Sequence, residues 1–196
     1  MYRCAFVLLL LVCMPWCAFS EEKVAGLSEE GYARLFLDAK DFPTGMEQVQ
    51  DVRRGAGARD EKFRELKGEQ AGFLVWMAKT TDTSVWRVAD ARWVFPSEEA
   101  AKAYLLGSLQ KLSEGTPEDK GAPKVGEDCH VFGPENPRVN EILGVKLRYY
   151  IYIFRSKNVV VKLFVSQGSA SKQPLEAKTV ASLSKAIVKR IEESAK

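Results

Sequence analysis

The sequence predicts an α+β domain, with a mainly antiparallel sheet of about five strands and helices packed on it. Three observations lead to this fold class. Residues Gly144–Ser166 alternate as the two long strands of a hairpin. Two more apolar strands, Phe73–Lys79 and Val85–Phe95, follow one another with only a polar turn between them. The segments Glu98–Ser113 and Leu175–Glu193 repeat apolar residues at helical spacing.

The first twenty residues have the pattern of a secretory signal peptide. Arg3 gives a basic start, Ala5–Val12 an apolar core, and Ala18-Phe19-Ser20 small residues at the positions that signal peptidase reads. The apolar run is shorter than the roughly 20 residues that span a bilayer. We therefore expect cleavage between Ser20 and Glu21, a secreted or periplasmic protein, and membrane contact only before cleavage. The alternative is an uncleaved anchor or a core helix.

The composition of residues 21–196 favours one globular domain. It has 28 basic and 26 acidic residues, a net charge of +2, which argues against a nucleic-acid binder. A chain of this length buries about 70% of its unfolded surface and forms a core without disulfides. Cys129 is the single cysteine in this range. It is expected to be buried as a small apolar side chain or to pair with another chain.

The N-terminal part is expected to contain one clear helix. Leu27–Leu37 begins with Ser28 as a fair N-cap, followed by two glutamates that suit the positive end of a helix. Residues 46–70 are polar and glycine-containing, and we interpret them as an irregular excursion with a short helix at Arg59–Leu66.

The remaining elements are predicted from helix-capping residues and from the proline- and glycine-containing segments that separate them. Pro96 ends the second strand, and Ser97 caps the helix Glu98–Ser113. Loops are predicted at Glu114–Gly126 and Gly133–Asn140, on either side of a short strand at Glu127–Phe132. One stripe of the last helix is expected to face the core: Val180, Leu183, Ile187 and Ile191.

The hairpin carries the functional prediction. An odd turn at Ser156–Asn158 would gather the aliphatic side chains on one face, with Ile153 opposite Val161. A two-residue turn would mix the faces and place Ile153 opposite Lys162, so the odd turn is preferred. The other face would then combine aromatic and basic side chains: Arg148, Tyr150, Tyr152, Phe154, Lys162 and Phe164.

These six residues are the predicted ligand- or partner-binding site. Aromatic rings and cations provide contact area and directed donors for a peptide, a protein, or a small hydrophobic or anionic ligand. Two other interpretations stay open. The face is the second half of the core, with basic stems reaching past the rings to water, or it is the interface of a homodimer in a structural envelope component.

Catalytic and metal motifs are weak in this sequence. Cys129 and the single histidine, His130, are neighbours on a strand and point to opposite faces, so neither a metal site nor a thiolate–imidazole pair is predicted. No cofactor is predicted either. The sequence therefore favours a non-enzymatic protein. The enzyme alternative places a site in loops 126–140, lined by Asp128, His130 and Glu135.

Four short stretches resemble a group of exported bacterial domains. They are Asp41-Phe42-Pro43-Thr44-Gly45, Phe95-Pro96-Ser97-Glu98-Glu99-Ala100, Gly126-Glu127-Asp128 and Phe154-Arg155-Ser156-Lys157-Asn158-Val159-Val160, followed by an amphipathic helix. The group comprises extracellular sensor domains of actinobacterial serine/threonine kinases and small lipoproteins with a PsbP-like α/β sandwich. The chain departs from the kinase sensors in lacking paired cysteines and a kinase or transmembrane segment. The resemblance implies a non-enzymatic ligand- or protein-binding domain, and supplies no functional residues.

Overall fold

The computed structural model describes residues 27–42, 45–53, 55–133, 138–140 and 145–195. The predicted signal peptide and its cleavage site lie outside the described residues. The elements follow in this order: α1 (Glu29–Arg34), η1 (Ala39–Asp41), β1 (Met46–Val52), η2 (Ala56–Arg59), α2 (Glu61–Glu65), β2 (Gln70–Ala78), β3 (Arg87–Val94), α3 (Glu98–Ser113), β4 (Glu127–Phe132), β5 (Arg138–Asn140), β6 (Val145–Leu147), β7 (Tyr149–Ser156), β8 (Val159–Ser166) and α4 (Ala177–Ser194).

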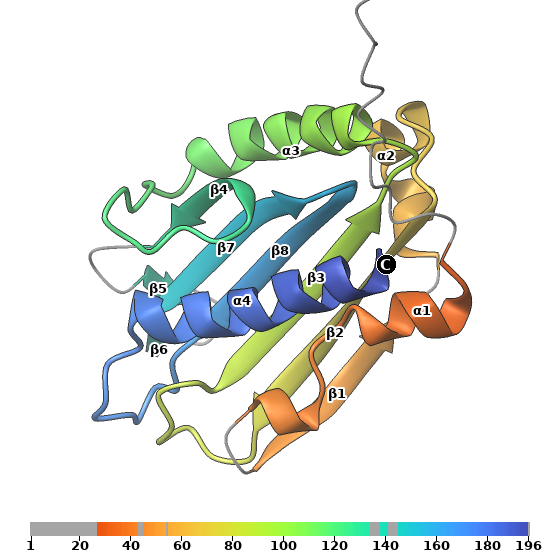
Figure 1. The fold of residues 1–196 in the computed structure, drawn as a ribbon. Coiled ribbons are helices and arrows are strands. Elements are labelled where there is room, and N and C mark those ends of the chain that lie inside the picture. Colours follow the sequence, from red (N-terminus) through yellow and green to blue (C-terminus); the bar gives the residue numbers. More distant parts are fainter. Residues whose placement is uncertain (1–26, 43–44, 54, 134–137, 141–144, 196) are drawn as a thin grey trace, which may run out of the picture.

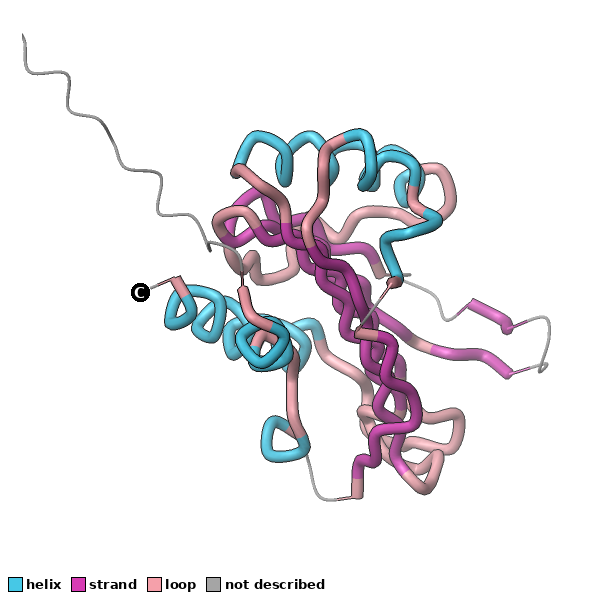
Figure 2. The backbone as a smooth tube through the Cα atoms, turned by 90° about the vertical axis from the view of Figure 1, so that its right-hand side faces the viewer, coloured by secondary structure: helices cyan, strands magenta, loops and turns pink. Residues whose placement is uncertain are grey.

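Six of the strands form one antiparallel sheet in the order β1-β2-β3-β8-β7-β4. Helices α1 and α4 pack on its first face, and α2 and α3 pack on its second face (Figures 1 and 2). The predicted α+β class, with a mainly antiparallel sheet, is confirmed. None of the helices in the described part of the chain is long and apolar enough to cross a bilayer.

Two apolar cores lie on the two faces of the sheet. The first joins α4 and the α1 segment to the sheet, and it includes the whole predicted stripe of α4: Val180, Leu183, Ile187 and Ile191. The second core joins α3 and α2 to the other face, around Phe95, Tyr104 and Leu105. The predicted caps are confirmed, because the Ser28 and Ser97 hydroxyls accept hydrogen bonds from the amides of Gly31 and Ala100.

The predicted excursion at 46–70 is wrong in its first part and correct in its second. Residues Met46–Val52 form β1, which makes the sheet six-stranded instead of five-stranded. This strand lies at the sheet edge and its side chains face water, so its sequence shows no apolar alternation. Its backbone pairing with β2 is what orders it. The predicted short helix is present as α2.

The predicted register of the hairpin is also wrong. Ser156 pairs with Val159, so the turn has two residues, Lys157 and Asn158, and Ile153 lies opposite Lys162. Lys157 has φ of 53°, the left-handed conformation that two-residue hairpin turns use. Asn158 is fully buried and bonds the backbone of Phe95 through its side chain and its carbonyl. This contact with the end of β3 favours the short turn.

The helices that pack on the sheet explain why each face of the hairpin can combine aliphatic side chains with aromatic or basic ones. Gathering the aliphatic residues on one face matters only when the other face meets water. Helices pack on both faces of the β7–β8 hairpin over part of its length, so both of its faces can carry apolar residues. Gly133–Asn140, predicted as a loop, contains the short strand β5, which pairs with β6 as a separate two-stranded sheet.

Arg155 fastens the end of β7 to α3 and β4. Its guanidinium donates to Glu98 (2.8 Å), Asp128 (3.2 Å) and Glu127, and to the carbonyl of Lys157 (2.9 Å). The Arg155 side chain is 9% exposed, whereas the Glu98, Asp128 and Glu127 side chains are 33%, 37% and 48% exposed, so water screens these ion pairs in part. Three carboxylates thus converge on one cation.

We expect Arg155→Met to lower the free energy of unfolding by about 2–3 kcal/mol, because charge-assisted hydrogen bonds are lost and three carboxylates remain together. Urea denaturation monitored by circular dichroism measures this. Arg87→Met is the matched control: Arg87 is exposed and makes no ion pair with any described residue, so a change below about 0.5 kcal/mol is expected. Equal losses in the two variants would contradict this role of Arg155.

Candidate functional site

The six predicted site residues do not share one face of the sheet. Tyr152 pairs with Leu163, and Tyr152 and Phe154 are 0% exposed within the first core. Tyr150 packs against the same core. Arg148 immediately precedes β7 and is half-buried. Lys162 and Phe164 face the second face, where Phe164 packs against the second core. The predicted single surface is therefore wrong, and it fails because of the register.

Coverage of the two faces is unequal. Along β3, Val88, Asp90, Arg92 and Val94 point to the first face and are 0% exposed. The intervening residues point to the second face, where Arg87 is exposed and the next three are only half-buried. Helix α3 packs on β8, β7 and β4 and leaves β2 and β3 uncovered along most of their length. Figure 1 shows α3 and α2 at one end of the sheet, whereas α4 crosses the middle of the first face.

The uncovered part of the second face has a regular pattern. Two rows of paired residues cross it, Phe73–Ala91–Lys162 and Val75–Ala89–Phe164, of which Val75 is buried, at 4% exposed. The two alanines form a low strip on β3, because the side chains on either side of them are larger. We define the open face by its half-buried side chains: Phe73, Met77, Ala89, Ala91, Lys162 and Phe164.

The alanine strip is bounded by Trp93 at one end and by Arg87 at the other. Trp93 follows Ala91 on the same face, and its ring lies 5.5 Å from that of Tyr104 on α3. At the other end Arg87 is exposed, so the strip opens to solvent there. Phe164 forms one wall and is fixed by stacking on Tyr149, with ring centroids 5.4 Å apart.

Lys162 is the one charged side chain within the open face. It lies between Ala91 on β3 and Ile153 on β7, half-buried, with no ion pair or hydrogen bond to any described residue. Burial lowers the pKa of its ammonium, since desolvation disfavours the charged form. None of the side chains that β2, β3 and β8 place on this face is a carboxylate. Glu47, beside Met77 on the edge strand, is paired with Lys79 at 2.8 Å.

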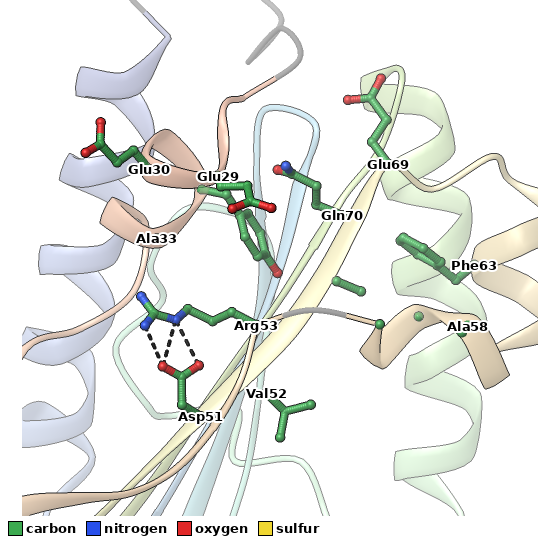
Figure 3. A pocket seen from close by; sticks show the side chains of 14 residues that line it. Glu29, Glu30, Ala33, Asp51, Val52, Arg53, Ala58, Phe63, Glu69 and Gln70 are labelled. Carbon is green, nitrogen blue, oxygen red and sulfur yellow. Dashed lines mark hydrogen bonds and ion pairs between the residues drawn. The ribbon is translucent and has the colours of Figure 1, made fainter.

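A separate cleft of about 840 Å³ lies at one end of the sheet (Figure 3). One wall comes from α1, the floor from β1 and β2, and the other wall from η2 and α2. Arg53 projects toward it, but its guanidinium pairs with Asp51, with Nε–Oδ1 at 2.9 Å. Three further carboxylates line the cleft: Glu29, Glu30 and Glu69. The cation that the structure describes in the cleft is therefore already neutralised.

The loops of the enzyme alternative do not bring its residues together. Asp128 accepts a hydrogen bond from Arg155, whereas His130 Nδ1 lies 3.0 Å from Glu118 Oε1. A hollow of about 430 Å³ is lined by His130 and Glu118 but not by Asp128. Glu135 lies outside the described residues. Cys129 packs against the first core, where burial raises the pKa of its thiol and disfavours the reactive thiolate. Among the described residues, no three potential ligands gather around a metal position.

The fold resembles that of a solved structure. The extracellular domain of PknH from Mycobacterium tuberculosis matches with a TM-score of 0.54 and 14% sequence identity, over 83% of this chain and 97% of that one. The likeness is one of fold. It supports the expected resemblance to extracellular sensor domains at the level of architecture only. No family model and no curated protein matches the sequence.

Sequence reasoning missed four members of the open face: Phe73, Met77, Ala89 and Ala91. The signal is present in the segment VADARWV, where small residues alternate with larger ones. This pattern becomes interpretable only once the neighbouring strands are known.

Proposed function

We propose that the protein is an exported, non-enzymatic binding domain that takes its ligand on the open face. The observation that carries the proposal is Lys162, a half-buried cation without a partner among apolar side chains. Desolvating a cation without compensation is unfavourable, so such a group is typical of a surface that a partner completes. The likeness in fold to an extracellular domain and the predicted signal peptide support the exported location.

The chemistry of the face favours an apolar ligand with an anionic group. Phe73, Met77 and Phe164 offer aromatic and flexible apolar contact area, which excludes water from a bound ligand. Lys162 offers a charge-assisted hydrogen bond. The cleft of Figure 3 offers no unpaired cation among its described residues, so the open face is the better candidate for an anionic ligand.

The test uses a hydrophobic anionic dye, anilinonaphthalene sulfonate, titrated by fluorescence. We expect the wild type to bind it, and Ala91→Trp to weaken binding at least tenfold, because the indole fills the strip beside Lys162. Ala103→Trp, on the exposed side of α3, is the matched control and should bind as the wild type does. Unchanged binding in Ala91→Trp would move the site elsewhere, with the cleft as the next position to test.

A further inference from the structure

We propose a second binding site on the first face of the sheet, which recognises a peptide bond within a short, uncharged segment of apolar residues. The site is a cleft over β1 and β2, and Trp76 and Gln48 are its recognition groups. It lies on the opposite face from the open face, so it does not depend on the proposed function. Three features lead to it: an indole N–H without an acceptor, a neighbouring side-chain amide, and a lining whose charges are already paired.

The cleft has a volume of about 810 Å³ and lies beside the α1 segment. The sheet contributes Leu74 and Trp76 from β2 and Gln48 from β1, while Phe36 and Arg190 line it from the α1 segment and from α4. It adjoins the cleft of Figure 3, because three residues line both: Glu30, Ala33 and Arg53. Pockets of about 300–1,000 Å³ accommodate small ligands, so this volume suits a short peptide segment.

Trp76 supplies a hydrogen-bond donor that lacks a partner. Its side chain lines the cleft, is 6% exposed, and packs on the ring of Phe42 with ring centroids 5.1 Å apart. The indole Nε1 is buried and makes no hydrogen bond to any described residue. An indole nitrogen can only donate, and an unpaired buried donor costs free energy, so a carbonyl oxygen is the group that would complete this site. Because the nitrogen is buried, a ligand reaches it only with a small movement of the indole or of its neighbours.

Gln48 places an amide beside that donor. It pairs with Trp76 across β1 and β2, so the Cβ atoms of the two residues lie about 5 Å apart on the same face. The Gln48 side chain is exposed, and its Nε2 donates to Asp51 at 3.4 Å, while no described residue donates to its Oε1. The indole N–H and the Gln48 carbonyl thus offer one donor and one acceptor, which complement the C=O and N–H of a peptide bond.

The charged side chains of the lining do not select a charged ligand. A carboxylate or an ammonium that entered the cleft would lose hydration and find no unpaired charge among the described residues. An uncharged segment avoids that cost, and its apolar side chains can contact the half-buried Leu27 and Ala33. Each charged residue of the lining has an opposite charge within 4.0 Å: Arg34 with Glu30, Lys40 and Arg190 with Asp38, Arg53 with Asp51, and Glu193 with Lys189.

The experiment follows the tryptophan indole N–H resonances by NMR while three compounds with the same 4-methylpentanoyl group are titrated: the N-methylamide, the methyl ester and the free carboxylate. We expect the amide to shift the resonance of Trp76, which Trp76→Phe assigns, and to leave that of Trp93 on the second face unchanged. The amide should bind about threefold more tightly than the ester, which lacks the N–H, and about tenfold more tightly than the carboxylate.

Two glutamines of β1 give a matched pair of variants. Gln48→Leu removes the acceptor of the site, whereas Gln50→Leu is the same change at an exposed position opposite Val75, on the second face. We expect Gln48→Leu to abolish the preference for the amide over the ester, and Gln50→Leu to retain it. An unshifted Trp76 resonance, equal binding of amide and carboxylate, or a Gln48→Leu variant that keeps the preference overturns the site. Ala91→Trp should leave this titration unchanged, and a loss of binding in that variant would assign the compounds to the open face instead.

Discussion

Replacing Asp90 by alanine is expected to destabilise the protein by about 3–5 kcal/mol, because it leaves the guanidinium of Arg92 buried without its counter-ion. Both side chains are 0% exposed and form an ion pair on β3, beneath the α1 segment. Asp90 Oδ2 also accepts a hydrogen bond from the amide of Leu37 at 2.9 Å. Since small domains are stable by only about 5–15 kcal/mol, this single change removes a large share of the stability.

A double variant distinguishes the net contribution of the ion pair to stability from the cost of leaving one buried charge without its partner. In Asp90→Leu with Arg92→Met, no buried charge remains, and we expect a stability within about 2 kcal/mol of the wild type or above it. The native pair is imperfectly satisfied, since Arg92 Nε and Nη2 have no hydrogen-bond partner and the guanidinium lies 5.3 Å from the ring of Phe36. Urea denaturation of both variants is the measurement. A double variant as unstable as Asp90→Ala would show that the pair itself stabilises the fold.

The same pair positions the N-terminal segment on the first face. Tyr32 donates its hydroxyl hydrogen to the carbonyl of Arg92 at 3.2 Å, and Leu37 bonds to Asp90. From α4, Arg190 bonds the carbonyl of Phe36 and the carboxylates of Asp38 and Asp41. The segment is thus joined to β3 and α4 by polar contacts in addition to its apolar ones. Asp90→Ala should loosen this segment first, so amide exchange at Leu37 is a second readout.

Elements with a strong local signal were predictable from the sequence. Helix α3 and strand β4 have the predicted bounds, because a capping serine and flanking loops mark them without reference to the rest of the fold. Strand β1 was not predictable, because an edge strand exposed on both faces has no apolar period. Its place in the sheet depends on β2, which begins at Gln70, beyond η2 and α2 in the chain.

The candidate site was only partly predictable for a related reason. Periodicity assigns residues to faces within a strand, but the relation between two strands depends on the turn. The buried contact of Asn158 with Phe95 joins positions far apart in the sequence, and it favours the two-residue turn. Lys162 and Phe164 thereby come to the open face, whereas Tyr152 and Phe154 enter the first core. Which part of the second face is left uncovered depends on the strands that α3 packs against, and no local pattern encodes that.

Alanine substitutions of Phe154 and Phe164 compare the packing of the first core with that of the open face. Phe154→Ala should cost about 3–5 kcal/mol, because a fully buried ring is removed from the first core and leaves a cavity. Phe164→Ala should cost about 1–2 kcal/mol, because that ring is half-buried and loses mainly its stacking on Tyr149. Both substitutions are the same chemical change on neighbouring strands, so the difference reports the packing of the two faces.

Urea denaturation with a shared m-value gives both free energies, and dye titration gives the binding of each folded variant. We expect Phe164→Ala to remain folded and to bind the dye more weakly, while Phe154→Ala loses stability with binding intact in its folded fraction. This pairing of effects follows from the register, since the two rings point to opposite faces of the sheet. Equal destabilisation would mean that the open face is packed as tightly as the core, and a surface of that kind has no room for a ligand.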